Sequence, residues 1–575
     1  MSLSLRLPLI IKTLILDECF LEERGRVLTL RLFVDTLDPV SKIRTVLLSV
    51  YPISMESTGT PTDHPVTQAE IDRLREAVLV TRPTLREIIE KRGHKTLYEY
   101  AREYSDVNLN PAITERQGEC ISTIRRHVTE QLGPIVGDGV AKQLEKYYFV
   151  STADHHGPIC HSFFLNSNLV TSITCLEQQD PVLKYVIAFS CANVSFSNHT
   201  YPRGLLFNTY VNGKIQTQQL GFFPNSSSVR QARVFNYRAY TRDDVDKVKR
   251  RLQELVAEGS VTEAIADRVE TLLQNIYLRE DILACTTYSE QITKSNYHLW
   301  NAMFDAIEKK GPHLLYIELE AIVMQLLLDH HMKKSTTLHR ILFDSAYGNA
   351  FVRIFNNIEG GFSVENGWGT YLFWGLPKDA KYPKKMRKVG QTLVSDDGSY
   401  TVPLTPEGIG QALRQKEVFP STQLSLLVLS LYYGMKCLGG FCQVNYLTYM
   451  KEVYKNMLQE LGDTESALAC ERVQTKELGE DLTIAFLGGP HGSRALATSL
   501  DVILYGTPET WQTLVDETRE IRLAEALNPM MPDFYPVMYK EVDRDPVLSK
   551  IKAEDIMKAT GLDQKVRICA TIPET

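Results

Sequence analysis

The sequence lacks the features of several large protein classes. Its longest apolar run, Leu424–Tyr433, is far shorter than the ~18 residues that a membrane-spanning helix needs. The N-terminus has no basic region followed by a long apolar core and a cleavage site, so we interpret it as part of the fold. The 63 Lys and Arg residues are outnumbered by 70 Asp and Glu and form no concentrated stripe, which gives no support to nucleic-acid binding. We therefore expect a small-molecule partner, with neither a membrane nor a nucleic acid.

Cysteine is also sparse, and the ten cysteines include no CxxC pair. Several of them lie inside apolar runs, which is typical of buried, reduced thiols in a cytoplasmic protein. The chain of 575 residues is long enough for about two to four domains, and its 43% hydrophobic content is that of a globular protein. The composition thus predicts a cytoplasmic protein with a substantial core.

The most informative stretch is residues 147–174, which has the pattern of a strand, a loop and a helix. Tyr147–Thr152 is rich in β-branched and aromatic residues, and a helical pattern begins at Ser162. Residues 180–198, DPVLKYVIAFSCANVSFSN, predict the next parallel strand, with a polar carboxyl end. Strand, helix and strand at this spacing form a βαβ unit, so we predict an α/β protein with a parallel sheet.

The loop Asp154–His161 is the first candidate site, because ligands of open α/β sheets bind at the carboxyl ends of the strands. Its candidate catalytic residues are Asp154, His155, His156 and His161. Histidine can exchange protons near neutral pH, contact phosphate or ligate a metal. Gly157 allows the backbone to approach a ligand, and the first turn of the following helix suits an anion. The alternative is that these histidines only satisfy backbone groups of the loop.

Polar residues beyond the second strand belong to the same expected edge. Asn193 and Asn198 follow that strand, and Arg203 lies in a turn from which it could reach a carboxylate or phosphate. We count these three residues among the candidate ligand-binding residues.

The remaining patterns divide the chain into five predicted parts. These are a β-rich N-terminal segment (1–60) with strands at 27–34 and 44–53, a first part of the core with the His-rich loop (61–240), a helical arm (241–300), a second part of the core with a loop-rich insertion (301–455), and a C-terminal α/β extension (456–575). Residues 313–334 predict an apolar helix, and 419–454 predict a helical run that restarts after Gly439-Gly440.

Residues 245–278 carry an apolar stripe at helical spacing, interrupted near Gly259. The pattern predicts a helical hairpin or a coiled-coil arm. A hairpin that projects from the core would expose its stripe, so we expect a homodimer that covers it. The alternative is a hairpin that lies flat on its own core.

Two further polar groups have simpler interpretations. Asp329-His330-His331, with His339, ends an apolar helix, where the helix dipole favours histidine. Gly488-Gly489 precedes His491, Ser493 and Arg494 and is either an anion site at a helix start or a tight turn.

Three segments, in this order, resemble the cysteine-adding enzyme (cysteine ligase) family of bacillithiol biosynthesis. The sequence V-S-T-A-D-H-H-G corresponds to the family's strand and T-G-Q-Q-x-G loop, with matches at Thr152 and Gly157. Residues 180–198 resemble the family's next strand, although Ser190–Asn193 replaces its acidic E-D-H-D. In 419–454 the residues Gly439, Gly440 and Tyr446 match, and Gln443 stands at or next to the family's glutamate.

The resemblance implies a Rossmann-like core of the nucleotidyltransferase type, a helical coiled-coil arm and a cytoplasmic, dimeric ligase that uses ATP with Mg²⁺. It adds Thr152, Gly157, Gly439, Gly440 and Gln443 to the expected nucleotide-binding residues. We therefore predict an ATP- or nucleotide-dependent ligase or transferase that joins an amino compound to a small-molecule carboxylate. Two alternatives remain open: a metal-dependent hydrolase with His155, His156 and His161 as ligands, and a catalytically inactive binding protein.

Overall fold

The computed structural model describes residues 19–23, 26–30, 66–107 and 109–574. The chain divides into two compact units, Met1–Thr60 and Pro61–Thr575. In the first unit, β1 (Cys19–Glu23) and β2 (Arg26–Leu30) form an antiparallel hairpin. The strand predicted at 27–34 overlaps β2, and the strand predicted at 44–53 lies outside the described residues.

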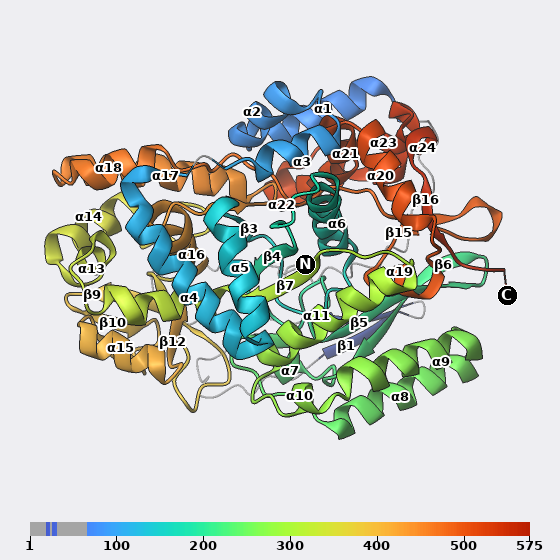
Figure 1. Cartoon of the computed structure of the whole chain (residues 1–575), viewed down its shortest axis with the longest axis horizontal. Helices are drawn as coiled ribbons and strands as arrows, with labels where there is room; N and C mark the ends of the chain where they lie inside the picture. The colour runs from blue at the N-terminus through green and yellow to red at the C-terminus, as the bar shows by residue number, and fades with distance from the viewer. Residues whose placement is uncertain (1–18, 24–25, 31–65, 108, 575) are drawn as a thin grey trace, which may run out of the picture. The chain divides into compact units, whose positions relative to one another are not determined.

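A four-stranded parallel sheet forms the centre of the second unit (Figure 1). Its strands, in spatial order, are β13 (Lys436–Leu438), β3 (Phe149–Ser151), β4 (Tyr185–Ser190) and β7 (His313–Glu318). β3, the helix α6 (Ser162–Glu177) and β4 make the predicted βαβ unit. Because Ser151 pairs with Leu438 and Ser190 with Glu318, both outer pairs of strands end level. We call the residues that directly follow these four strands the carboxyl edge.

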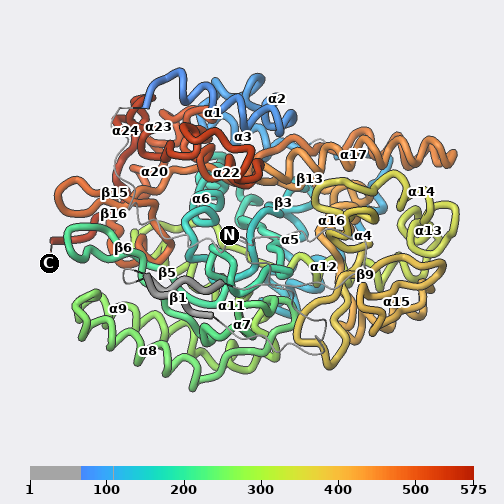
Figure 2. Tube along the Cα trace, turned by 180° about the vertical axis from the view of Figure 1, so that it is seen from behind, coloured from blue at the N-terminus to red at the C-terminus, as the bar shows by residue number. Residues whose placement is uncertain are grey.

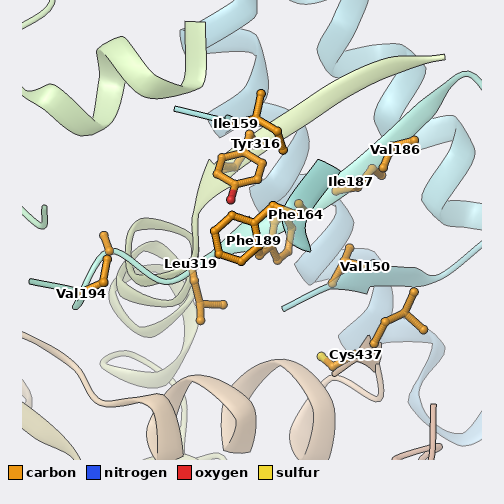
Figure 3. Packing of buried hydrophobic residues seen from close by; sticks show 14 of the residues in the cluster. Val150, Ile159, Phe164, Val186, Ile187, Phe189, Val194, Tyr316, Leu319 and Cys437 are labelled. Atoms are coloured by element: carbon orange, nitrogen blue, oxygen red, sulfur yellow. The ribbon is translucent and has the colours of Figure 1, made fainter. Parts of the chain in front are cut away.

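Helices cover the sheet and bury its side chains. α4 (Thr114–Leu132), α5 (Pro134–Lys146) and α11 (Tyr288–Ala306) lie in front of the strands in Figure 1. Gln143 of α5 holds the start of β4, since its Nε2 donates to the Tyr185 carbonyl over 2.8 Å. Figure 3 shows the apolar core, which combines side chains of all four strands with Phe164 of α6.

The loop-rich insertion contains a second, antiparallel sheet of five strands. Their order is β11 (Thr401–Pro403), β10 (Thr392–Ser395), β9 (Lys384–Val389), β8 (Phe373–Gly375) and β12 (Val418–Pro420). β9, β10 and β11 are joined as hairpins, with Gly398 at positive φ in the turn between β10 and β11. A stack of Phe235 on Phe419, with ring centroids 4.2 Å apart, joins this sheet to the segment after β6 (Lys214–Gly221).

The predicted arm is a helical hairpin that packs on the rest of the unit, and the described residues contain no coiled coil. It consists of α8 (Arg242–Ala257) and α9 (Glu263–Leu272). Val248, Leu252 and Val269 are at most 1% exposed within one chain. Arg268 anchors α9 by donating to the Ile503 and Leu504 carbonyls. The exposed stripe from which a dimer was expected therefore does not occur, and the dimer itself stays a prediction.

Two predicted helices contain strands instead. Residues 313–334 begin with β7 and only then form α12 (Leu319–Leu326), and 419–454 contains β13 between α16 (Thr422–Leu426) and α17 (Gln443–Glu460). Both strands are largely buried, so their sequences show no alternation of polar and apolar residues and merge with the adjacent apolar helices.

The other elements surround this core (Figure 2). They are α1 (Gln68–Val80), α2 (Pro83–Arg92), α3 (Leu97–Ser105), the β5 (Gly204–Val211) and β6 hairpin, α7 (Ser227–Gln231), α10 (Glu280–Leu283), α13 (Thr337–Phe343), α14 (Ser345–Phe355), α15 (Pro406–Arg414), α18 (Thr464–Glu471), the small sheet of β14 (Phe486–Gly488), β15 (Arg494–Leu496) and β16 (Ile568–Thr571), α19 (Ser499–Tyr505), α20 (Thr510–Glu520), α21 (Leu523–Leu527), α22 (Met531–Met538), α23 (Ala553–Thr560) and α24 (Leu562–Lys565).

Two further findings concern the helices and the cysteines. Among the described helices, none is both long and apolar enough to cross a membrane. The cysteines from Cys120 to Cys569 are free thiols, as the sequence predicted.

Candidate functional site

The His-rich loop lies at the carboxyl edge, as predicted, but α11 holds it tightly. Asn296 of α11 accepts a hydrogen bond from the Ile159 N–H over 2.9 Å and donates to the Gly157 carbonyl over 2.8 Å. A Cβ on Gly157 would lie 2.8 Å from the Cα of Pro202, so this glycine serves close packing. The His156 N–H also donates to the Cys191 carbonyl. These backbone N–H groups are therefore used within the protein and are not presented to a phosphate.

His156 is a buried link in a chain of hydrogen bonds. Its Nδ1 lies 2.6 Å from the Ser190 hydroxyl, and its Nε2 lies 3.0 Å from the Ser289 hydroxyl. Ser289 in turn donates to the carboxyl of Glu318 at the end of β7. Burial lowers the pKa of His156 to about 4, so the ring is neutral at pH 7. Both ring nitrogens of His156 therefore have hydrogen-bond partners within the protein.

His155 and His161 form an aromatic cluster with His199. The ring centroids of His161 and His199 are 5.7 Å apart, and both His155 and His161 lie 5.6 Å from Phe164. Burial lowers the pKa of His155 to about 4 and that of His161 to about 3. His161 also caps α6, since its Nδ1 accepts a hydrogen bond from the Phe163 N–H. The predicted catalytic histidines are thus neutral at pH 7, and His161 has a role in the helix start.

Asp154 is fully buried at the end of β3. Its two oxygens accept hydrogen bonds from Ser151 over 3.1 Å and from Asn168 of α6 over 2.9 Å. Burial nevertheless raises its pKa to about 6. The nearby Tyr316 hydroxyl on β7 donates to the His155 carbonyl over 2.7 Å, and burial, followed by the charge of Asp154, raises its pKa. The sequence thus correctly placed a titratable carboxyl at the edge.

The predicted Gly439-Gly440 turn brings in two acidic residues that the sequence analysis missed. The Gly439 carbonyl accepts hydrogen bonds from the N–H groups of Gly479 and Glu480. The next residue, Asp481, accepts a bond from the Phe441 N–H over 2.8 Å and has a φ of 65°, which is unusual for a residue with a side chain. These contacts place Glu480 and Asp481 directly over the carboxyl end of β13.

Glu480 is a largely buried carboxyl at the edge. It is 8% exposed, and no hydrogen bond from the described part of the chain reaches its carboxyl oxygens. Burial, Asp481 and then Asp154 raise its pKa well above the ordinary value, and burial raises the pKa of Asp481 to about 6. Asp154, Glu480 and Asp481 form what we call the carboxyl cluster.

Two glutamates from the end of β7 were also missed. Glu320 accepts hydrogen bonds from the backbone N–H groups of Ala192 and Asn193, over 2.9 and 3.0 Å, and so fixes the loop after β4. Burial, followed by the charge of Glu320, raises the pKa of Glu318 to about 7. Their signal was the Y-I-E-L-E pattern at 316–320, which becomes informative only when 313–318 is recognised as a strand.

The predicted nucleotide-binding residues have mixed positions. Gln443 donates to the Thr152 hydroxyl over 2.5 Å, so the two residues join the start of α17 to the end of β3. The Asn193 side-chain oxygen is buried without a hydrogen-bond partner among the described residues. Asn198 accepts bonds from Thr200, which also contacts His155, and Arg203 stacks on the Tyr201 ring at 4.9 Å.

The other polar groups singled out in the sequence are structural. His331 contacts the hydroxyls of Thr336 and Tyr433, and His339 contacts the His331 carbonyl. His330 pairs with Glu119 at 3.5 Å, while Asp329 pairs with Arg126. Gly488 and Gly489 lead into a tight turn in which His491 has a φ of 57°.

Across the described residues, no group of three or more His, Cys, Asp or Glu side chains is arranged to hold a metal ion. The sequence matches no protein-family model and no curated protein.

Proposed function

We propose that the protein is an enzyme that joins an amino compound to a small-molecule carboxylate, with the carboxyl cluster as the site of the amine. The observation that supports this most directly is Glu480, a buried carboxyl without a hydrogen-bond partner among the described residues. A largely buried carboxyl that makes no hydrogen bond within the described residues is available to a ligand that donates to it. An ammonium group supplies both a charge and three donors for a cluster of carboxylates.

The raised pKa of Glu480 suits the chemistry of such a reaction. An amine attacks a carbonyl only after its ammonium form has lost a proton, and a carboxylate with a raised pKa is a stronger base than an ordinary one. In this proposal Glu480 takes one proton from the ammonium and becomes neutral, and the free amine then attacks. Asp154 and Asp481 keep the pKa of Glu480 high through their charges.

Formation of a C–N bond in water also requires an activated carboxylate. The proposal takes the nucleotide, ATP with Mg²⁺, from the family resemblance described above. The His-rich loop is a poor phosphate site, because its N–H groups donate to Asn296 and to the Cys191 carbonyl. The phosphates would therefore bind elsewhere at the edge.

The metal-dependent hydrolase has no supporting observation of this kind. His156 uses both ring nitrogens on Ser190 and Ser289, so only His155 and His161 of the proposed ligands remain available. An inactive binding protein with the same amine site is the alternative that an experiment must separate from the enzyme.

Isothermal titration calorimetry with a panel of amino acids and polyamines tests the amine site. We expect saturable binding by the wild type and a loss of about tenfold or more in Glu480→Gln, which keeps the shape but cannot ionise. Glu465→Gln removes an exposed carboxylate from α18 and is the matched control. Absence of binding by the whole panel, or unchanged binding by Glu480→Gln, would contradict the proposal.

Turnover distinguishes the enzyme from the inactive binding protein. The same amines are incubated with ATP, Mg²⁺ and a panel of carboxylic acids, and release of ADP or AMP is measured. Amine-dependent release that disappears in Glu480→Gln supports the enzyme. Amine binding without any nucleotide consumption favours the binding protein.

A further inference from the structure

A cavity with several cationic residues opens beside the carboxyl edge. It has a volume of about 560 Å³ and lies between residues 232–237, 376–383 and 415–417. Its charged residues are Arg233, Lys378, Lys381, Lys416 and Glu417, and we call it the basic cavity. The volume is within the range of small-molecule sites, roughly 300–1,000 Å³.

The cavity is connected to the edge through backbone contacts. The Val234 and Phe235 N–H groups donate to the carbonyls of Val194 and Ala192, over 3.1 and 2.9 Å. These bonds fix the segment that carries Arg233 against the loop that follows β4. The stack of Phe235 on Phe419 fixes the same segment to the insertion sheet.

Two of its cations act on residues of the edge. Burial raises the pKa of the Cys191 thiol and of Glu318, and the charges of Arg233 and of Lys416 respectively oppose that rise.

The cationic residues of the cavity have no close acidic partner among the described residues. In the ranges that the structure describes, none of the four cations forms an ion pair with an acidic residue, and Glu417 accepts its bond from the Tyr400 hydroxyl over 3.1 Å. Arg233 has in addition a buried Nε–H without a hydrogen-bond partner among these residues. A guanidinium normally presents its donors to a carboxylate or phosphate, so Arg233 is suited to contact a bound anion.

We propose that the basic cavity binds a small-molecule anion with two or more phosphate groups, and that Arg233 contacts it from the side of the carboxyl edge. Four cations exceed what a single carboxylate needs and correspond to the charge of a di- or triphosphate. The half-buried Tyr237 and the apolar Leu376 and Pro377 supply contacts for the rest of the ligand. Binding of the anion is inferred from the cavity alone. Only the use of this anion as the co-substrate of the ligation rests on the proposed function.

Calorimetry with the full-length protein tests this site. The probes are pyrophosphate, tripolyphosphate, ATP and citrate, each without Mg²⁺. We expect pyrophosphate and tripolyphosphate to bind, with an affinity that falls steeply as salt is added, and citrate to bind more weakly. Tighter binding of citrate than of both phosphates would overturn the phosphate assignment, and no binding of any probe would overturn the site.

Three variants locate the binding. Arg233→Gln and Lys381→Gln should each weaken tripolyphosphate binding about tenfold. Lys142→Gln removes an exposed charge from α5 and should leave the affinity unchanged. If circular dichroism shows that Arg233→Gln does not fold, Lys381→Gln alone tests the cavity. Lys381 is exposed, so its replacement leaves the core intact. Wild-type affinity in Lys381→Gln, and in Arg233→Gln where that variant folds, would overturn the proposal.

The amine site and the anion site are tested independently by the same variants. Glu480→Gln should retain tripolyphosphate binding, because Glu480 is not among the residues that line the basic cavity. Arg233→Gln should retain amine binding. Loss of phosphate binding in Glu480→Gln would place the anion in the carboxyl cluster and overturn its assignment to the cavity.

Discussion

Gly440 and Asp481 lie in such close contact that a Cβ on the glycine would stand 2.9 Å from the carboxyl oxygen Oδ2 of the aspartate. That oxygen is the one that accepts the hydrogen bond from the Phe441 N–H. The same Cβ would lie 3.1 Å from the Oε2 of Glu480. The absence of a side chain at position 440 therefore allows both acids to occupy the carboxyl end of β13.

This contact predicts the effect of Gly440→Ala. The added methyl should push Asp481 and Glu480 aside, weaken amine binding about tenfold and destabilise the fold by about 1–3 kcal/mol. Calorimetry and urea denaturation measure the two effects. Gly118→Ala in α4 is the control, because a Cβ there meets nothing within 4 Å. It should stabilise the protein by about 0.5–1 kcal/mol without affecting the amine.

His156 predicts a pH-dependent difference in stability. Its pKa is about 4 in the folded protein and about 6.5 in the unfolded chain. Between these values the unfolded state binds a proton that the folded state does not, so the contribution of neutral His156 is full above pH 6.5. It then falls by about 1.4 kcal/mol per pH unit as the pH drops towards 4.

We therefore expect His156→Gln to be destabilised most at pH 7 and progressively less at pH 6 and pH 5, as urea denaturation of variant and wild type would show. Glutamine keeps hydrogen-bonding capacity towards Ser190 and Ser289, which separates the titration from the loss of contacts. His94→Gln, at an exposed turn, should change nothing at any of these pH values. A destabilisation of His156→Gln that is constant with pH would contradict the assignment.

The buried Glu517 of α20 predicts that the stability of the fold decreases as the pH rises. It is fully buried, neither oxygen has a hydrogen-bond partner among the described residues, and burial raises its pKa to about 9. Because the unfolded chain releases this proton at about pH 4.3, stability falls by up to about 1.4 kcal/mol per pH unit between these values. Glu517→Gln removes the titration and should be more stable than the wild type at pH 8, with a smaller gain at pH 6. Equal stabilities at pH 8 would contradict the raised pKa.

The burial of the helical hairpin predicts that charged substitutions on its apolar face destabilise the chain. Val269 is 0% and Leu272 9% exposed within one chain. Val269→Glu plus Leu272→Glu should therefore destabilise the chain by several kcal/mol and lower its Tm strongly, as scanning calorimetry would show. Ala264→Glu places the same charge on the exposed face of α9 and should leave the Tm unchanged. A well-folded double variant with half the native mass would instead support the dimer.

The sequence predicted the fold best where a single segment carries the complete pattern of a strand or a helix. Tyr147–Thr152 and 180–198 predicted β3 and β4 because apolar runs with polar ends alternate there with a helix. β7 and β13 escaped prediction because a largely buried strand shows no alternation, and here each adjoins an apolar helix.

The same distinction applies to the site. Asp154, Gln443 and the Gly439-Gly440 turn were predicted because each is next to a strand or helix signal. Glu480 was not, since its position depends on hydrogen bonds from 479–480 to Gly439 and on the pairing of Asn166 with the Ile484 N–H. Such contacts between distant segments leave no local pattern in a single sequence.

The clamp of Asn296 on the His-rich loop has a consequence for the order in which the molecule forms. The loop between β3 and α6 is synthesised well before α11, which supplies both of its side-chain hydrogen bonds. The first βαβ unit therefore emerges from the ribosome with an unfinished turn, and Glu480 joins it only when most of the chain exists. A nascent chain that ends before residue 478 would carry Asp154 without its acidic neighbours, so any activity of the cluster should appear only with nearly complete protein.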